Sequence, residues 1–185
     1  MGYKYTWFDR TRRFLMRDLP NFLINIYKFR KALWNHHWWD YSGTLDFIQI
    51  GVEDIANGVE KKGIEVKVTR LKKVERMRRV VEIIKNIRED RYFDIVVEEM
   101  GRGLGGLNYE FIPCEDKPGF LEMVDKDSEE EQEFKDKYFA RMRELEESEW
   151  NELWDILKGP DYSKFDRDKD WEKIYDGSGL SAWWD

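Results

Sequence analysis

The sequence predicts a compact, mainly α-helical domain of about five helices with a small β-hairpin. Apolar residues recur at steps of three and four over long stretches, as they do on one face of a helix. Residues that start and stop helices bracket these stretches. The chain has 185 residues, 41% hydrophobic and 38% charged, which is enough to bury a real core. We therefore expect a single domain over residues 1–185, with a tail at 160–185 that is either flexible or docked.

The first predicted helix covers residues 20–34. Pro20 suits the first turn of a helix, and the apolar residues after it recur at helical spacing. The segment before it, from Tyr5 to Leu19, mixes aromatic and basic residues. This segment is either a short helix closed by Pro20 or an arm on the surface, and the sequence does not choose between the two.

Two long amphipathic helices are predicted next. Ser42 or Thr44 can cap the first, and Gly63 ends it. The second follows Thr69 and lasts until about Asp90. Their apolar positions are Leu45, Ile48, Val52, Ile55 and Val59 in the first helix, and Leu71, Val74, Met77, Val81, Ile84 and Ile87 in the second.

A shorter helix and a hairpin follow. Residues 92–100 have a helical pattern, and the four glycines within 101–106 then interrupt regular structure. No Gly-Lys-Ser/Thr completes a phosphate-binding loop there, so the glycines predict a flexible connection. Residues 107–112 and 120–124 alternate between apolar and polar side chains, which predicts two paired strands.

The last predicted helix is long and acidic. Ser128 with Glu131 three residues later forms a capping box, and acids in the first turn suit the helix dipole. The helix runs to about Lys158, because Gly159-Pro160 stops it. Its apolar stripe consists of Phe134, Tyr138, Met142, Leu145, Trp150, Leu153, Trp154 and Leu157.

Charge is distributed unevenly along the chain. The net charge is −7, but residues 1–40 carry +5 and residues 115–185 carry −12. General binding to nucleic acid is disfavoured, because that acidic third repels a polyanion. There is no apolar run long enough to span a membrane, no signal peptide, and a single cysteine, Cys114. We therefore expect a cytoplasmic protein without a membrane partner.

A cluster of aromatic residues and histidines at 34–41 is the first candidate site. Its rings can stack a planar ligand while the histidines and the tyrosine donate hydrogen bonds. A metal site with His36 or His37 and Asp40 is a second interpretation, although a third ligand is missing. A third is that the rings fill the corner between two helices. The candidate ligand-binding residues are Trp34, His36, His37, Trp38, Trp39 and Tyr41.

A basic stripe is the second candidate site. Lys72, Arg76 and Arg79 share one face of their helix and suit phosphate or carboxylate groups of a ligand. Glu75 and Glu82 lie within one turn of Arg79, so the same stripe is more typical of a solvated face with ion pairs. Acids scattered over 82–99 suggest a magnesium site like that of all-helical nucleotide pyrophosphatases, without distinctive spacing.

Two tryptophan motifs carry a resemblance to a known group of proteins. The sequence Trp38-Trp39-Asp40-Tyr41-Ser42, the helices and Glu-rich region after it, and the ending Trp183-Trp184-Asp185 resemble a family of small uncharacterised proteins from tailed bacteriophages. The resemblance covers most of the chain but supplies no catalytic or binding residue. It implies expression in the cytoplasm of an infected bacterium, where small phage proteins often inhibit host defence.

Three functions follow from these observations. The first is a non-enzymatic sponge for an anionic, nucleotide-like immune signal, which stacks on the indoles and meets the basic stripe. The second is an interaction module whose acidic helix and exposed aromatics engage a host protein. The acidic side chains of this module would mimic the charge of a nucleic acid. The third is a metal-dependent nucleotide hydrolase. We expect no cofactor. The apolar Trp183-Trp184 end is expected to dock, on its own chain or on a neighbour. A homo-oligomer is compatible with the sequence.

Overall fold

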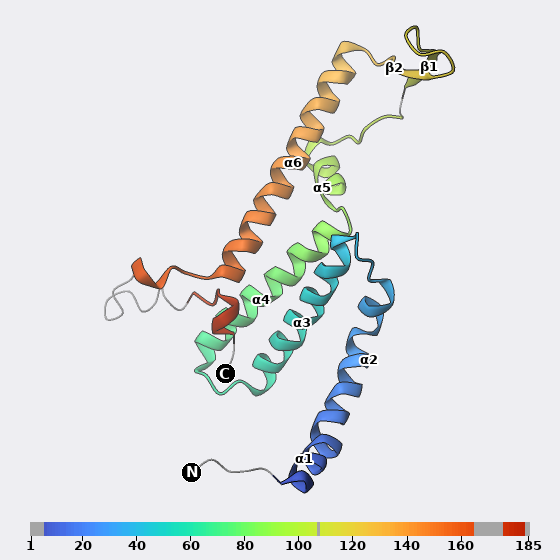
Figure 1. Ribbon diagram of the computed structural model, residues 1–185. Helices are drawn as coiled ribbons and strands as arrows, with labels where there is room; N and C mark the ends of the chain where they lie inside the picture. Colours follow the sequence, from blue (N-terminus) through green and yellow to red (C-terminus); the bar gives the residue numbers. More distant parts are fainter. Residues whose placement is uncertain (1–5, 107, 165–175, 184–185) are drawn as a thin grey trace.

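The computed structural model describes residues 6–106, 108–164 and 176–183, and over them the chain is mainly helical, as predicted. Three helices form the core: α3 (Tyr41–Lys62), α4 (Lys67–Arg88) and α6 (Glu129–Lys158). A shorter helix, α5 (Tyr92–Met100), lies beside the first half of α6, and a hairpin and an N-terminal helical arm project from this body (Figure 1).

The core lies between α3, α4 and the second half of α6. Helices α3 and α4 run antiparallel: Arg88 pairs with Asp46 at one end of the helix pair, and Arg70 donates to the Gly63 carbonyl at the other end. The predicted apolar stripes of α3 and α4 point into this core, with Leu71 as the exception at 47% exposed. The buried core residues are Leu45, Val52, Ala56, Val59, Val74, Met77, Val80, Ile83, Ile84, Ile87, Tyr92, Leu153, Ile156 and Trp183.

The N-terminal segment is a continuous helical arm. It consists of α1 (Trp7–Arg13), a π-helical turn η1 (Phe14–Asp18) and α2 (Leu19–Asn35). Pro20 cannot donate a backbone hydrogen bond and its ring crowds the preceding turn, so the wider turn before it lets the helix continue. Here the Leu19 N–H reaches back five residues to the Phe14 carbonyl. Residues 6–19 therefore form part of a projecting arm, and the helix is not closed by Pro20 but continues through it.

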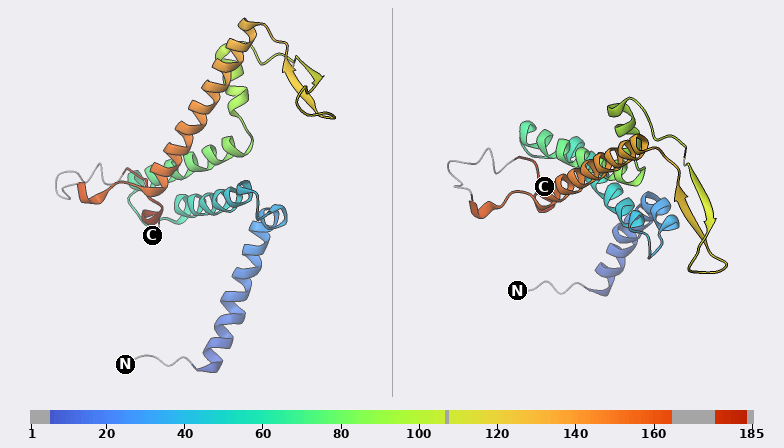
Figure 2. Two further views of the ribbon diagram at one scale, coloured as in Figure 1. Left: turned by 45° about the horizontal axis from the view of Figure 1, so that its top comes forward. Right: turned by 90° about the horizontal axis from the view of Figure 1, so that it is seen from above.

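The predicted hairpin is confirmed. Strands β1 (Tyr109–Pro113) and β2 (Leu121–Asp125) pair antiparallel, with Phe111 opposite Met123. The hairpin follows α5 and precedes α6, and it stands clear of the helical body in each view (Figures 1 and 2).

Helix ends agree with the sequence predictions except at three N-termini, of which the one predicted at Pro20 lies inside the continuous arm. Asp40 caps α3 in place of Ser42 or Thr44, accepting from the Ser42 N–H at 2.9 Å and its hydroxyl at 2.6 Å. Helix α4 begins at Lys67, ahead of Thr69. Helix α6 is capped by Ser128 as predicted, and Gly159 ends it at a φ of 73°.

The described part of the C-terminal tail docks on the core. Trp183 is 1% exposed and donates its indole N–H to the Gly177 carbonyl at 2.9 Å. Gly177 has a φ of 89° and lies against the backbone of Lys72, where a β-carbon would be 2.6 Å from the carbonyl. The predicted docking of Trp183 is therefore confirmed, and it occurs on the same chain. Trp184, Asp185 and residues 165–175 lie outside the described residues.

Candidate functional site

The aromatic cluster forms the junction between α2 and α3. Helix α2 ends at Asn35, and His36 adopts an extended backbone with a ψ of 122°. The Asp40 N–H then bonds to the His37 carbonyl at 3.1 Å, which turns the chain into α3. Gly43 lets the His36 ring lie close to the start of α3, because a β-carbon there would be 2.8 Å from Nδ1 of His36.

The indole rings of the junction face solvent instead of filling the corner. Trp34 is 88% exposed, Trp38 87% and Trp39 67%. The rings of His37 and Trp39 stack with centroids 4.8 Å apart, and Trp38 meets Trp39 edge to face at 5.6 Å. The rings of His37, Trp38 and Trp39 therefore contact one another in geometries that aromatic pairs prefer.

Helix α6 extends this exposed aromatic surface. The rings of Tyr41 and Trp150 lie with centroids 6.5 Å apart, and Trp154 follows Trp150 by one helical turn. Trp154 is 66% exposed, so its assignment to the apolar stripe of α6 is wrong, and Trp150 faces solvent in part. We call this surface the aromatic face, and its residues are Trp38, Trp39, Tyr41, Trp150 and Trp154.

The basic stripe on α4 does not present three free cations. Arg79 pairs with Glu82 at 3.2 Å, Glu149 at 3.0 Å and Glu152 at 2.7 Å. Hydrogen bonding to Glu152 holds the pKa of the Arg79 guanidinium above its usual range, and the same bond lowers the pKa of Glu152. The ion-pair interpretation is therefore correct for Arg79, with two of its partners contributed by α6.

Glu149 connects this ion-pair cluster to the core. Its carboxylate accepts from Arg79, from the Asn86 amide at 3.1 Å and from the Tyr92 hydroxyl at 2.9 Å. Burial raises the pKa of Tyr92, and the bond to Glu149 adds to the shift. Asn86 and Tyr92 are buried, so this network fixes the position of α6 on α4.

The structure does not bring the two predicted halves of the ligand site together. Arg88 pairs with Asp46 in the second turn of α3, so this end of α4 lies beside the junction. Arg76 precedes Arg88 by twelve residues and therefore lies about 18 Å from it along the axis of α4. Lys72 lies one turn further from the junction. One copy of the chain therefore does not form the combined pocket of indoles and cations expected from the sequence.

The acids that suggested a magnesium site are dispersed or paired. Glu99 accepts from Arg141 at 2.8 Å, and this bond lowers its pKa. Glu82 pairs with Arg79. Within residues 6–106, 108–164 and 176–183, no three His, Cys, Asp or Glu side chains are grouped closely enough to hold a metal ion.

Comparison of the chain with protein-family models, curated proteins and solved structures gives no match. The function is therefore inferred from the chain's own residues. No described helix has both the length and the apolar composition needed to cross a bilayer.

Proposed function

We propose that this chain is a non-catalytic interaction module that binds a basic surface of another protein through its aromatic face. The observation that carries this proposal is the proximity of Tyr41 and Trp150, which joins the junction to the acidic helix α6. The site is an open surface formed by two elements, and such a surface suits a protein better than a small molecule, which needs an enclosing pocket.

The composition of the aromatic face supports a protein partner. Tryptophan and tyrosine provide much of the binding energy at protein interfaces, because they bury a large area at little cost in side-chain entropy. Trp38 and Trp39 contact each other before any partner arrives, so binding orders them less than it would order isolated side chains.

The charge of α6 indicates what kind of surface this face binds. The helix carries eleven acidic and five basic side chains, a net charge of −6. Glu146 and Glu147 precede Trp150 by four and three residues, which places them on its side of the helix. A basic patch, such as a nucleic-acid site, complements this charge, and the resemblance to tailed-phage proteins makes a bacterial host protein the expected partner.

The nucleotide-sponge hypothesis has less support and remains a prediction. An anion near Arg76 would also meet Glu75, Glu82 and Glu152, which line the same hollow, and Arg79 is already paired. Thermal-shift titration with cyclic dinucleotides and ADP-ribose derivatives tests the hypothesis. A shift that Trp38→Ala removes would favour the sponge over the protein partner.

Affinity capture followed by titration tests the proposed function. The tagged chain captures its partner from a bacterial extract, and the purified partner is then titrated calorimetrically with wild-type chain and with variants. We expect Trp38→Ala combined with Trp39→Ala to weaken binding by at least about tenfold. Ile64→Ala is the matched control, because Ile64 is 89% exposed and remote from the aromatic face.

The contribution of the acidic side chains to partner binding is tested separately, through the association rate. Glu146→Gln with Glu147→Gln should lower the association rate and flatten its dependence on salt. If the partner binds nucleic acid, an oligonucleotide duplex should displace the chain from it. Equal binding by wild type and by the tryptophan double variant would refute the proposal.

A further inference from the structure

Beyond the exposed apolar side of α2, the described residues form two apolar surfaces that lie outside both the core and the aromatic face. One belongs to the tip of the arm, which we define as residues 7–18, and the other belongs to the hairpin. Exposed apolar patches of this kind mark interaction surfaces in soluble proteins. From these two surfaces we infer that two copies of this chain dimerise reciprocally, with the arm tip of each copy packed on the hairpin of the other.

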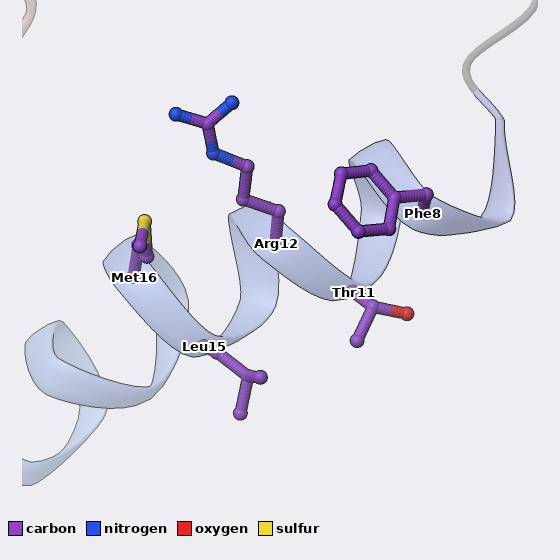
Figure 3. A pocket seen from close by; sticks show the side chains of 5 residues that line it. All are labelled: Phe8, Thr11, Arg12, Leu15 and Met16. Carbon is purple, nitrogen blue, oxygen red and sulfur yellow. The ribbon is translucent and has the colours of Figure 1, made fainter.

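No described residue of the same copy covers the arm tip. Phe8 is 67% exposed, Leu15 55% and Met16 74%. Together with Thr11 and Arg12 these residues line a shallow hollow along one side of the helix (Figure 3). Among the described elements, the arm packs on the body mainly through α2, and Ala32 of α2 is the one buried residue of the arm. A helix with this much apolar surface gains little stability unless something packs on it.

The hairpin has the same deficiency. Its strand pairing places Tyr109, Phe111, Leu121 and Met123 on one side of the ribbon, and all four are exposed. Apart from the strands pairing with each other, the hairpin makes no substantial contact with the described helices. An isolated two-stranded hairpin is marginally stable in water, and packing against a helix is a usual way to stabilise one.

The two surfaces are complementary in charge and in size. Residues 7–18 carry four basic and two acidic side chains, whereas residues 108–127 carry two basic and six acidic ones. Asp125 stands opposite Tyr109 on the apolar side of the hairpin, and Arg12 lies within the hollow of the arm tip. A five-residue strand spans about 17 Å, which matches about eleven residues of helix, close to the length of the tip.

The arm tip and the hairpin of one copy do not meet, which is why a second copy is required. The tip and the hairpin lie at opposite ends of the molecule in Figure 1 and in the left view of Figure 2. Pairing two arm tips with each other would bring Arg10, Arg12 and Arg13 of both copies together, which like-charge repulsion disfavours. Reciprocal exchange covers all four surfaces and closes with twofold symmetry.

This inference goes beyond the proposed function, because it involves neither the aromatic face nor a host protein. Sedimentation velocity of the full chain should give twice the chain mass of 22.6 kDa. Leu15→Glu and Met123→Glu should each raise the dimer dissociation constant at least about tenfold, since each places a carboxylate in an apolar contact. Ile64→Glu, at a more exposed site outside both surfaces, should leave this dissociation constant unchanged.

A charge exchange between copies distinguishes this interface from any other. Arg12→Glu and Asp125→Lys should each weaken the homodimer, because each sets like charges against each other in both interfaces. Mixing the two variants should restore wild-type affinity, since every interface of the mixed dimer then joins opposite charges. A monomeric wild-type chain at about 100 µM, or a dimer in which mixing gives no rescue, would overturn the inference.

The single cysteine provides a direct view of the contact. Cys114 lies just past β1, where its N–H bonds to the Phe120 carbonyl at 2.9 Å. Chain carrying a nitroxide on Cys114 is mixed with isotope-labelled chain carrying Cys114→Ser. Broadened amide signals from residues 7–18 of the labelled chain support the exchange. Broadening confined to α2 or to the core helices would contradict it.

Discussion

Replacing Glu149 by alanine tests whether the Arg79 cluster is structural. The change removes the acceptor of two buried donors, the Tyr92 hydroxyl and the Asn86 amide, which are 3% and 8% exposed as residues. Each unsatisfied buried donor costs about 1–3 kcal/mol, while Arg79 keeps its bonds to Glu152. Because water can enter the space left by a partly exposed side chain, we expect a total loss of about 2–4 kcal/mol.

Chemical and thermal denaturation followed by circular dichroism measure this loss. For a chain of this length it corresponds to a fall in Tm of roughly 4–16 °C. Glu149→Gln keeps one amide acceptor and should lose about half as much, whereas Glu147→Ala on the exposed side should change stability by less than about 0.5 kcal/mol. Equal stability of Glu149→Ala and Glu147→Ala would refute the structural role and return Arg79 to the candidate ligand residues.

Three further changes test other parts of the structure. Gly177→Ala should detach the tail and lower the Tm by several degrees, because its β-carbon would clash with the Lys72 backbone; Gly119→Ala, also at positive φ but in open space, should have a smaller effect in the same melt. The lowered pKa of Glu152 adds stability above its ordinary value of 4.5 that is lost as pH falls, so acid titration should destabilise wild type more than Glu152→Gln. Trp38→Ala should change the Tm by little, since the side chain is exposed, and a large fall would assign it to the core.

Local signals predicted much of the fold. Helix α5 has the bounds expected from residues 92–100, and α6 begins after Ser128 and ends at Gly159 as its capping and stop residues predict. The strands of the hairpin begin and end within two residues of their predicted bounds. These elements depend on neighbours in sequence, such as side chains that cap a helix and glycines that end it, so the sequence alone contains their cause.

Long-range contacts account for what the sequence did not predict. Arg79 meets Glu149 and Glu152 about seventy residues later, and no local pattern signals that pairing. Trp150 and Trp154 fit an apolar stripe on α6, but the core of α3 and α4 reaches only the side that carries Leu153. A stripe tells which residues are apolar, whereas the neighbours of the helix determine which of them are covered.

The candidate site was predicted in part. The tryptophans of the junction at residues 34–41 are exposed, and the rings of His37, Trp38 and Trp39 contact one another, whereas ligand binding by this junction stays a prediction. Its continuation onto α6 depends on the contact between Tyr41 and Trp150, which are more than a hundred residues apart. Its separation from Arg76 follows from the antiparallel pairing of α3 and α4, which the sequence alone does not specify.

Hydrogen–deuterium exchange of the full chain with its captured partner tests the central claim most directly. We predict slower exchange in the partner complex at residues 36–42 and along α6 from Glu146 to Trp154, because the partner covers the aromatic face. The N-terminal part of α4 around Lys72 should exchange at the same rate as in the free chain. Protection around Lys72 and Arg76, with the junction unchanged, would contradict a binding face formed by these tryptophans.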